Sequence, residues 1–263
     1  MAEPGSRRPL SRGEWISIAL ATAIIGGAVY LWQRSAAPPP APPANRVEAH
    51  AEAGAEAAPP TVPGPGVDEA TARALLEGVS PAPSLRRWLG LGDAYQRWAV
   101  VTDNLAEGVS PRKQLELFAP KGPFAVVERA GRTLIAPASY GRYDGFVDAV
   151  ASVDPQAFAR AYRALHPVVE AAYRALGYPG ASLDRATALA LSRIERAPAR
   201  DGEVEVVGDR GLYLFADPEL ERLGEVEKHL LRMGPNNTRV LQGKARELRE
   251  ALALPPDVAR QQP

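Results

Sequence analysis

The chain has 263 residues, and its 31 lysine and arginine residues balance its 31 aspartate and glutamate residues. This balance argues against nucleic-acid binding, which usually needs a basic excess. The sequence contains no cysteine, which excludes disulfides, thiol catalysis and thiolate metal sites.

The first predicted element is a membrane-spanning helix over residues 15–32, a stretch without charged side chains. At 1.5 Å per residue it would span roughly 27 Å, close to the roughly 30 Å hydrocarbon core of a bilayer. Trp15 stands at one end, and Tyr30 and Trp32 at the other, where aromatic rings favour the membrane interfaces. A cleaved signal peptide would have a shorter apolar region, and its best cleavage site, at 35–37, is followed by proline. We therefore predict an uncleaved anchor.

Flanking charges predict the orientation of this helix. Arg7, Arg8 and Arg12 precede it, whereas only Arg34 follows closely. The positive-inside rule places residues 1–14 in the cytoplasm. We expect a single-pass protein of a bacterial inner (cytoplasmic) membrane with its C-terminal domain in the periplasm.

Small residues recur every four positions within the predicted span, at Ala19, Ala23 and Gly27. Such a stripe permits close helix–helix approach and would support a weak homodimer through the membrane. Chance spacing in an alanine-rich span explains the pattern more simply, and we favour that explanation.

Residues 33–66 form a predicted linker that is rich in proline and alanine. Proline-rich chain adopts an extended conformation and cannot build a hydrophobic core. At about 3.1 Å per residue, the stretch 36–66 would reach up to roughly 95 Å. The linker would let the next domain work at a distance from the membrane, with a passive spacer as the default.

Residues 67–254 are predicted to form a mostly α-helical domain with one or two small β-hairpins, followed by a disordered tail over 255–263. Candidate helix starts are Asp68, Ser84, Asp154 and Asp217, all of residue types that cap helices. Apolar residues then recur every three or four positions in five sets. These sets cover residues 95–105, 143–153, 158–176, 183–194 and 241–252.

Pro167 interrupts the third apolar set, and its ring would remove one helical hydrogen bond. The apolar phase continues across it, which predicts a kinked helix or two helices nearly in line. The hairpins are predicted from residues 124–128 with 132–136 and from 203–207 with 212–215.

Five unusual strings occur in one order along this domain. They are RWAVVTDNLAEG (97–108), YGRYDGFV (140–147), AYRALHPVVEAAYRALGYP (161–179), LYLFADPELE (212–221) and LLRMGP (230–235). The strings resemble a family of bacterial membrane-anchored proteins, the domain of unknown function numbered 3014, over roughly residues 68–252. The resemblance implies a single span, a proline-rich linker and this C-terminal domain. The family has no assigned activity, so the resemblance implies no catalytic residue.

Little in the sequence points to catalysis. His166 and Glu170 could share one helix face and bind a metal, but Pro167 distorts that face and a third ligand is missing. We predict no metal and no other cofactor, with His166 packing beside the proline. Ser110 precedes a proline and is interpreted as a turn or a helix start. Neither a nucleophile elbow nor a phosphate-binding loop is present.

Acidic pairs carry the alternative prediction of an envelope enzyme that acts on a glycan or peptide. Asp144 with Asp148, and Glu221 with Glu225, are spaced to share a helix face. This alternative predicts two acids that converge in a deep cleft, with the pKa of one raised by burial. Such pairs usually lie on solvated helix surfaces, so we predict no catalytic residues.

Basic residues in the C-terminal helices could form a strip for an acidic partner, although a solvated helix surface is favoured. They are Lys228, Arg232, Arg239, Lys244, Arg246 and Arg249.

One further polar set mixes aromatic, arginine and acidic side chains, and tyrosine with arginine is typical of recognition surfaces. Some members also have a plain structural explanation as helix ends, caps or ion pairs. The predicted binding residues are Asp103, Asn104, Tyr140, Arg142, Tyr143, Asp144, Asp217 and Arg232.

Together these features predict a membrane-anchored protein of the cell envelope. It would contact the lipid bilayer through residues 15–32, and its helical domain would bind an envelope protein or cell-wall material. A structural anchor that acts through the membrane helix itself is a third hypothesis.

Overall fold

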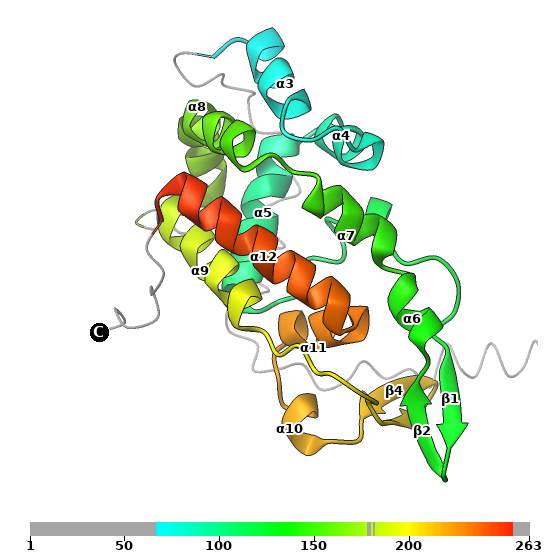
Figure 1. Ribbon diagram of the computed structural model, residues 1–263. Coiled ribbons are helices and arrows are strands. Elements are labelled where there is room, and N and C mark those ends of the chain that lie inside the picture. Colours follow the sequence, from blue (N-terminus) through cyan, green and yellow to red (C-terminus); the bar gives the residue numbers. More distant parts are fainter. Residues whose placement is uncertain (1–66, 178–179, 181, 255–263) are drawn as a thin grey trace, which may run out of the picture. The chain divides into compact units, whose positions relative to one another are not determined.

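The computed structural model describes residues 67–177, 180 and 182–254 (Figure 1). The predicted membrane helix over residues 15–32, the linker and the C-terminal tail lie outside these residues and stay predictions. Within the described ranges, no helix is long and apolar enough to cross a membrane.

The described part is mostly helical, which confirms the prediction of a mostly α-helical domain with small β-hairpins. Two small antiparallel hairpins and one 3-10 helix, η1 (Glu116–Phe118), accompany the α-helices. The α-helices are α3 (Glu69–Glu77), α4 (Pro83–Leu89), α5 (Ala94–Glu107), α6 (Pro137–Gly141), α7 (Asp144–Ala151), α8 (Pro155–Arg174), α9 (Leu183–Arg196), α10 (Pro218–Glu221), α11 (Glu225–Met233) and α12 (Pro235–Leu252).

Three of the four predicted helix starts are confirmed. The carboxylates of Asp68, Asp154 and Asp217 each accept a hydrogen bond from a backbone N–H two or three residues later and cap α3, α8 and α10. The prediction for Ser84 is wrong, because α4 begins at Pro83. Proline already has the backbone angle of the first helical position, so it sets this start without a side-chain cap.

Helix α8 carries one face of the largest hydrophobic core. Its buried residues Tyr162, Leu165, Val169 and Tyr173 follow the predicted spacing and pack with residues of α5 and α9. Ala99 on α5 has no exposed surface, so the small side chain allows close helix approach. Helix α12 lies between α7 and α9 and covers this arrangement (Figure 1).

Pro167 lies inside α8, which continues as one helix from Pro155 to Arg174. The structure therefore selects one helix from the two predicted arrangements. Buried residues on both sides of the proline, Leu165 and Val169, keep the two halves on one core and offset the lost hydrogen bond.

Both predicted hairpins are present, with strands β1 (Val126–Arg129), β2 (Arg132–Ile135), β3 (Val206–Asp209) and β4 (Leu212–Phe215). Each turn has two residues with positive φ, one of them glycine, as two-residue hairpin turns require. Ile135 N–H donates to the Val204 carbonyl at 2.9 Å and joins the two hairpins side by side. One face of the second hairpin is buried through Val206 and Phe215 against Leu231 of α11.

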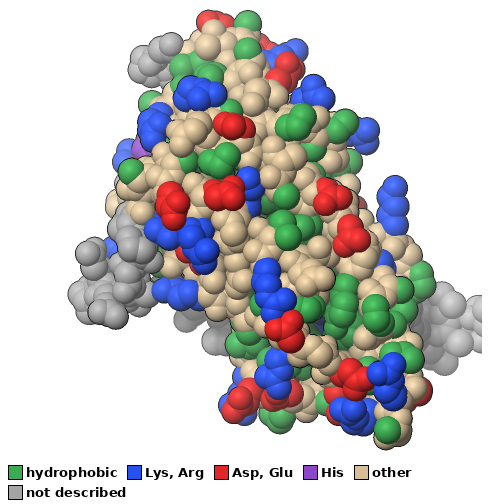
Figure 2. All heavy atoms as spheres, in the orientation of Figure 1, with side chains coloured by type: hydrophobic (Ala, Val, Ile, Leu, Met, Phe, Trp, Pro, Cys, Tyr) green, Lys and Arg blue, Asp and Glu red, His purple; other side chains and the backbone are tan. Residues whose placement is uncertain are grey.

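The basic residues of the predicted strip on the C-terminal helices all have hydrogen-bond or ion-pair partners inside the domain. Figure 2 shows lysine and arginine side chains interspersed with acidic ones on the face that carries α12. Each of the six basic residues has a partner: Lys228 with Glu221, Arg232 with the Tyr213 carbonyl, Arg239 with Asp201, Lys244 with Glu247, and Arg246 and Arg249 with Glu195. This surface therefore offers no strip of unpaired positive charge.

Candidate recognition site

Four of the predicted binding residues form a compact group where α6 meets α7. We call Tyr140, Arg142, Tyr143 and Asp144 the Tyr–Arg cluster. Asn237 of α12 donates from Nδ2 to the Tyr140 carbonyl at 3.3 Å and to Asp144 Oδ1 at 2.9 Å. These bonds fix the cluster to the start of α12.

The ring of Tyr140 packs on Gly234, between α11 and α12. A Cβ atom at Gly234 would lie 2.6 Å from Tyr140 Cγ, so no larger residue fits without movement. Gly234 also has a φ of +86°, which favours glycine. Burial raises the pKa of the Tyr140 hydroxyl, so this group stays protonated at neutral pH.

Arg142 lies between two aromatic rings. Its guanidinium carbon is 5.5 Å from the centre of the Phe124 ring and 5.6 Å from that of Tyr143. Its nitrogens donate to the carbonyls of Gly122 at 3.1 Å and Ser139 at 3.2 Å. Among the described residues, Arg142 forms no ion pair with a carboxylate, so its positive charge is not neutralised locally.

Arg232 of α11 has a structural role. Its Nη2 donates to the Tyr213 carbonyl at 2.7 Å, and the guanidinium lies 4.8 Å from the Phe215 ring centre. Glu221 accepts a hydrogen bond of 2.9 Å from the Phe215 N–H. Both contacts satisfy groups on the open edge of β4, an edge that would otherwise invite another strand.

His229 joins the Tyr–Arg cluster to the loop that follows α5. A hydrogen bond of 2.8 Å connects His229 Nδ1 with Ser110 Oγ, and the Tyr143 ring meets the imidazole edge-on at 5.6 Å. Burial, helped by the positive charges of Arg112 and Arg232, lowers the pKa of His229 to about 4. A base this weak accepts a proton poorly near neutral pH, so the pair is ill-suited to nucleophilic catalysis.

The remaining predicted residues lie in other settings. Asn104 Nδ2 donates to Gln114 Oε1 at 3.4 Å, and Asp103 is its neighbour on α5. Asp217 caps α10 and lies 3.7 Å from Arg200. None of these contacts reaches the Tyr–Arg cluster, and Asp217 matches its predicted structural explanation as a cap.

The acidic pairs proposed for an enzyme do not act as pairs. Burial raises the pKa of Glu221, but hydrogen bonds from Lys228 and from the Phe215 N–H outweigh it and hold that pKa below its usual range. Glu225 accepts from the Ser110 N–H at 3.1 Å, away from this contact. Asp144 and Asp148 are both exposed. The direction of the Glu221 shift is opposite to that expected of a general acid.

A cavity of about 230 Å³ lies between α5, α9 and α11. Its lining contains one carboxylate, Glu227, which pairs with Arg193 at 2.9 Å. Ligand pockets usually enclose about 300–1,000 Å³. This cavity is smaller than such a pocket, and with one carboxylate it lacks the two converging acids that the enzyme alternative predicts.

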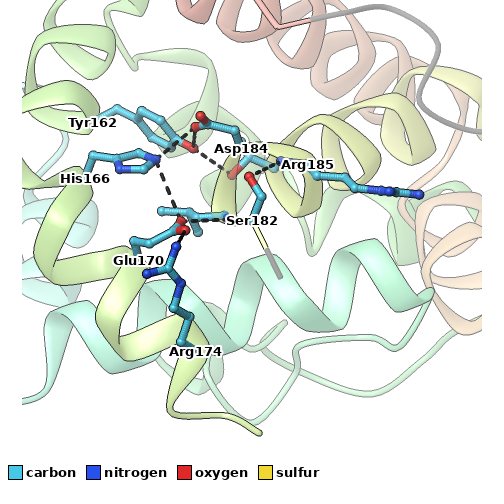
Figure 3. A network of polar contacts seen from close by, with 9 residues as sticks. Tyr162, His166, Glu170, Arg174, Ser182, Asp184 and Arg185 are labelled. Atoms are coloured by element: carbon cyan, nitrogen blue, oxygen red, sulfur yellow. Dashed lines mark hydrogen bonds and ion pairs between the residues drawn. The ribbon is translucent and has the colours of Figure 1, made fainter. Parts of the chain in front are cut away.

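A second polar network connects α8 with α9 (Figure 3). The Tyr162 hydroxyl donates to Asp184 Oδ1 at 2.6 Å, and His166 Nε2 lies 3.1 Å from the same oxygen. Glu170 accepts from Arg174 at 2.7 Å and from the Leu183 N–H at 2.8 Å. Burial and the bond to Asp184 raise the pKa of Tyr162 strongly. The network fastens the start of α9 to α8.

This network includes His166 and Glu170, the pair considered for a metal. His166 Nε2 and Glu170 Oε2 are 3.8 Å apart. In the ranges that the structure describes, no group of three or more histidine, aspartate or glutamate side chains is arranged to hold a metal ion. His166 instead packs edge-on against Tyr162, with ring centres 5.5 Å apart.

Residues 109–125, between α5 and β1, form an exposed segment that we call the basic loop. It contains three cations, Arg112, Lys113 and Lys121, against one acid, Glu116. All three cationic residues are exposed, and none forms a side-chain hydrogen bond or ion pair within the described part of the chain. Sequence reasoning missed this loop, because three cations in 17 positions are unremarkable until their lack of partners is known.

Contacts with several elements hold the basic loop in place. Trp88 Nε1 donates to the Gln114 carbonyl at 2.7 Å, and Ser110 bonds to His229. Phe118 meets Phe146 of α7 edge-on at 5.5 Å, and Arg142 donates to the Gly122 carbonyl. The loop therefore presents its cations from a fixed backbone beside the Tyr–Arg cluster.

Comparison with known families supports the resemblance noted in the sequence. A family model described as "Protein of unknown function (DUF3014)" matches residues 94–249. The matched range runs from the start of α5 into α12, so it includes the basic loop and the Tyr–Arg cluster. Comparisons with curated proteins and with solved structures give no match.

Proposed function

The chain belongs to the family described as "Protein of unknown function (DUF3014)", and because this description names no activity, we propose a function from the sequence and the site. The protein is a membrane-anchored recognition module of the bacterial cell envelope. Residues 15–32 hold it in the inner membrane, and the linker over 33–66 gives its periplasmic domain reach. The domain binds another envelope component, with the basic loop and the adjacent side chains of Arg142 and Asp144 as its binding surface.

The single observation that carries this proposal is that the anchored basic loop holds three cations without partners among the described residues. The six basic residues of the C-terminal helices all have partners inside the domain, whereas Arg112, Lys113 and Lys121 have none among the described residues. Surface cations without intramolecular partners remain available to an external one. The adjacent Arg142 is of a residue type that often dominates binding energy at interfaces, whereas Tyr143 is buried and contributes no exposed ring.

The test is site-specific photocrosslinking in living cells. A photoreactive amino acid replaces Lys113 in the basic loop, and a control chain carries it at the exposed Arg160 of α8. We expect a distinct crosslinked envelope component from position 113 and not from position 160. A chain that contains only residues 1–66 controls for contacts of the anchor and linker. Equal products from both positions would refute the proposed surface.

A reporter fused after residue 263 tests the proposed address. We expect activity from a reporter that works only outside the cytoplasm. Activity confined to a cytoplasmic reporter would refute the orientation derived from the arginines before the span.

A further inference from the structure

We propose that the basic loop binds an acidic peptide segment of a partner protein, with acidic side chains on Arg112, Lys113 and Lys121 and an apolar side chain against Val109 and Leu117. This inference rests on the proposed function and names the chemistry of its partner.

Charge is the first argument. The loop has three exposed cations and one acid. The Tyr–Arg cluster beside it adds Arg142, whose acceptors are backbone carbonyls, and the exposed Asp144, and Glu225 accepts from the Ser110 N–H. Arg112 also lies close enough to His229 and Arg232 for its charge to act on both. A partner surface of negative charge would be complementary to the three exposed cations of the loop.

Exposed apolar side chains in the same loop are the second argument. Val109 is 46% exposed and Leu117 is 40% exposed, although large apolar residues favour burial. A free phosphate or a purely acidic polymer would leave both side chains in water. A peptide that alternates acidic and apolar residues would cover them while it pairs with the cations.

The number and anchoring of the cations favour a peptide over a lipid surface. Recognition of anionic lipid typically uses clusters of about 4–8 lysine and arginine residues. The basic loop has three, and contacts to Trp88, His229, Phe146 and Arg142 fix its backbone. A fixed loop suits a partner of defined shape, because little conformational entropy is lost on binding.

Binding can be measured by fluorescence anisotropy on the purified full chain in nanodiscs of zwitterionic lipid. The probe is a labelled ten-residue peptide of alternating glutamate and leucine. A ten-residue oligoglutamate probe carries negative charge without apolar side chains and tests binding by charge alone. Inorganic phosphate, added as a competitor, tests whether a simple anion binds at the same place. Flotation with phosphatidylglycerol vesicles tests the lipid surface.

The decisive variant combines Arg112→Gln, Lys113→Gln and Lys121→Gln. We expect it to weaken binding of the alternating peptide by about 10- to 100-fold, because each exposed charge contributes modestly. The matched control combines Arg160→Gln, Arg196→Gln and Arg222→Gln, which removes equal charge from exposed positions on and beside α8, α9 and α10. The control should change binding by less than about twofold. Circular dichroism verifies that both variants fold.

Leu117→Ser separates the apolar contact from charge. We expect it to weaken the alternating peptide by about threefold and to leave oligoglutamate binding unchanged, because only one probe offers an apolar side chain. Equal losses in the two triple variants would overturn the proposal. So would oligoglutamate binding as tightly as the alternating peptide, or loop-dependent flotation with vesicles in place of peptide binding.

The outcomes also separate this inference from the proposed function. If position 113 crosslinks a partner in cells while no acidic peptide binds, the recognition surface stands and the peptide chemistry is wrong. If position 113 crosslinks nothing above the control and no peptide binds, both proposals fail.

Discussion

His229 makes the stability of the domain depend on pH. Burial lowers the pKa of the folded imidazole to about 4, whereas an unperturbed histidine titrates near 6.5. The folded chain therefore binds a proton on His229 less readily than the unfolded chain does. This contribution to stability is fully present above pH 6.5 and is lost progressively as the pH falls from about 6.5 to about 4.

The magnitude follows from the difference between the two pKa values. That difference corresponds to on the order of 3 kcal/mol of unfolding free energy lost across this range. The substitution His229→Asn places an amide where Nδ1 meets Ser110 and removes the titrating group. We expect the variant to lose about 2–3 kcal/mol less than the wild-type chain between pH 7 and pH 4.

Urea denaturation of the purified full chain in detergent, followed by tryptophan fluorescence, measures both proteins at each pH. The low pKa of Glu221 also makes stability fall in acid, but this effect is common to both chains and cancels in the comparison. Equal losses in the two proteins would refute the reasoning. An NMR titration that places the pKa of His229 near 6.5 would refute it as well.

Two further substitutions test local packing. Gly234→Ala combines positive φ with a clash against Tyr140, so we expect it to lower the unfolding free energy measured by urea denaturation by about 2–4 kcal/mol. The control Gly122→Ala, at a similar φ but with open space around it, should lower the unfolding free energy by only about 1 kcal/mol. Equal losses in the two variants would contradict the clash. Tyr162→Phe removes the hydrogen bond to Asp184 and should cost about 1–3 kcal/mol. The wild-type chain should also lose more stability than this variant above pH 10, because the unfolded tyrosine ionises there and the folded one does not.

Local sequence patterns predicted the elements of the domain well. Asp154 before proline marked the start of α8, and the spacing of Tyr162, Leu165, Val169 and Tyr173 marked its buried face. Caps and apolar periodicity depend on residues within one or two helical turns, so a single sequence contains the necessary information. The same patterns could not decide between one helix and two at Pro167, because the packing on both sides of the proline settles that choice.

The candidate site shows what only the tertiary structure decided. The sequence singled out Tyr140, Arg142, Tyr143 and Asp144, and their proximity follows from neighbouring positions. It could not pair Ser110 with His229, which are 119 positions apart, because no local pattern links them. Which cations find acidic partners also depends on side chains that folding brings together. Sequence by itself therefore determined where charge lies along this chain, and the packing of its helices decided which of those charges remain available to a partner.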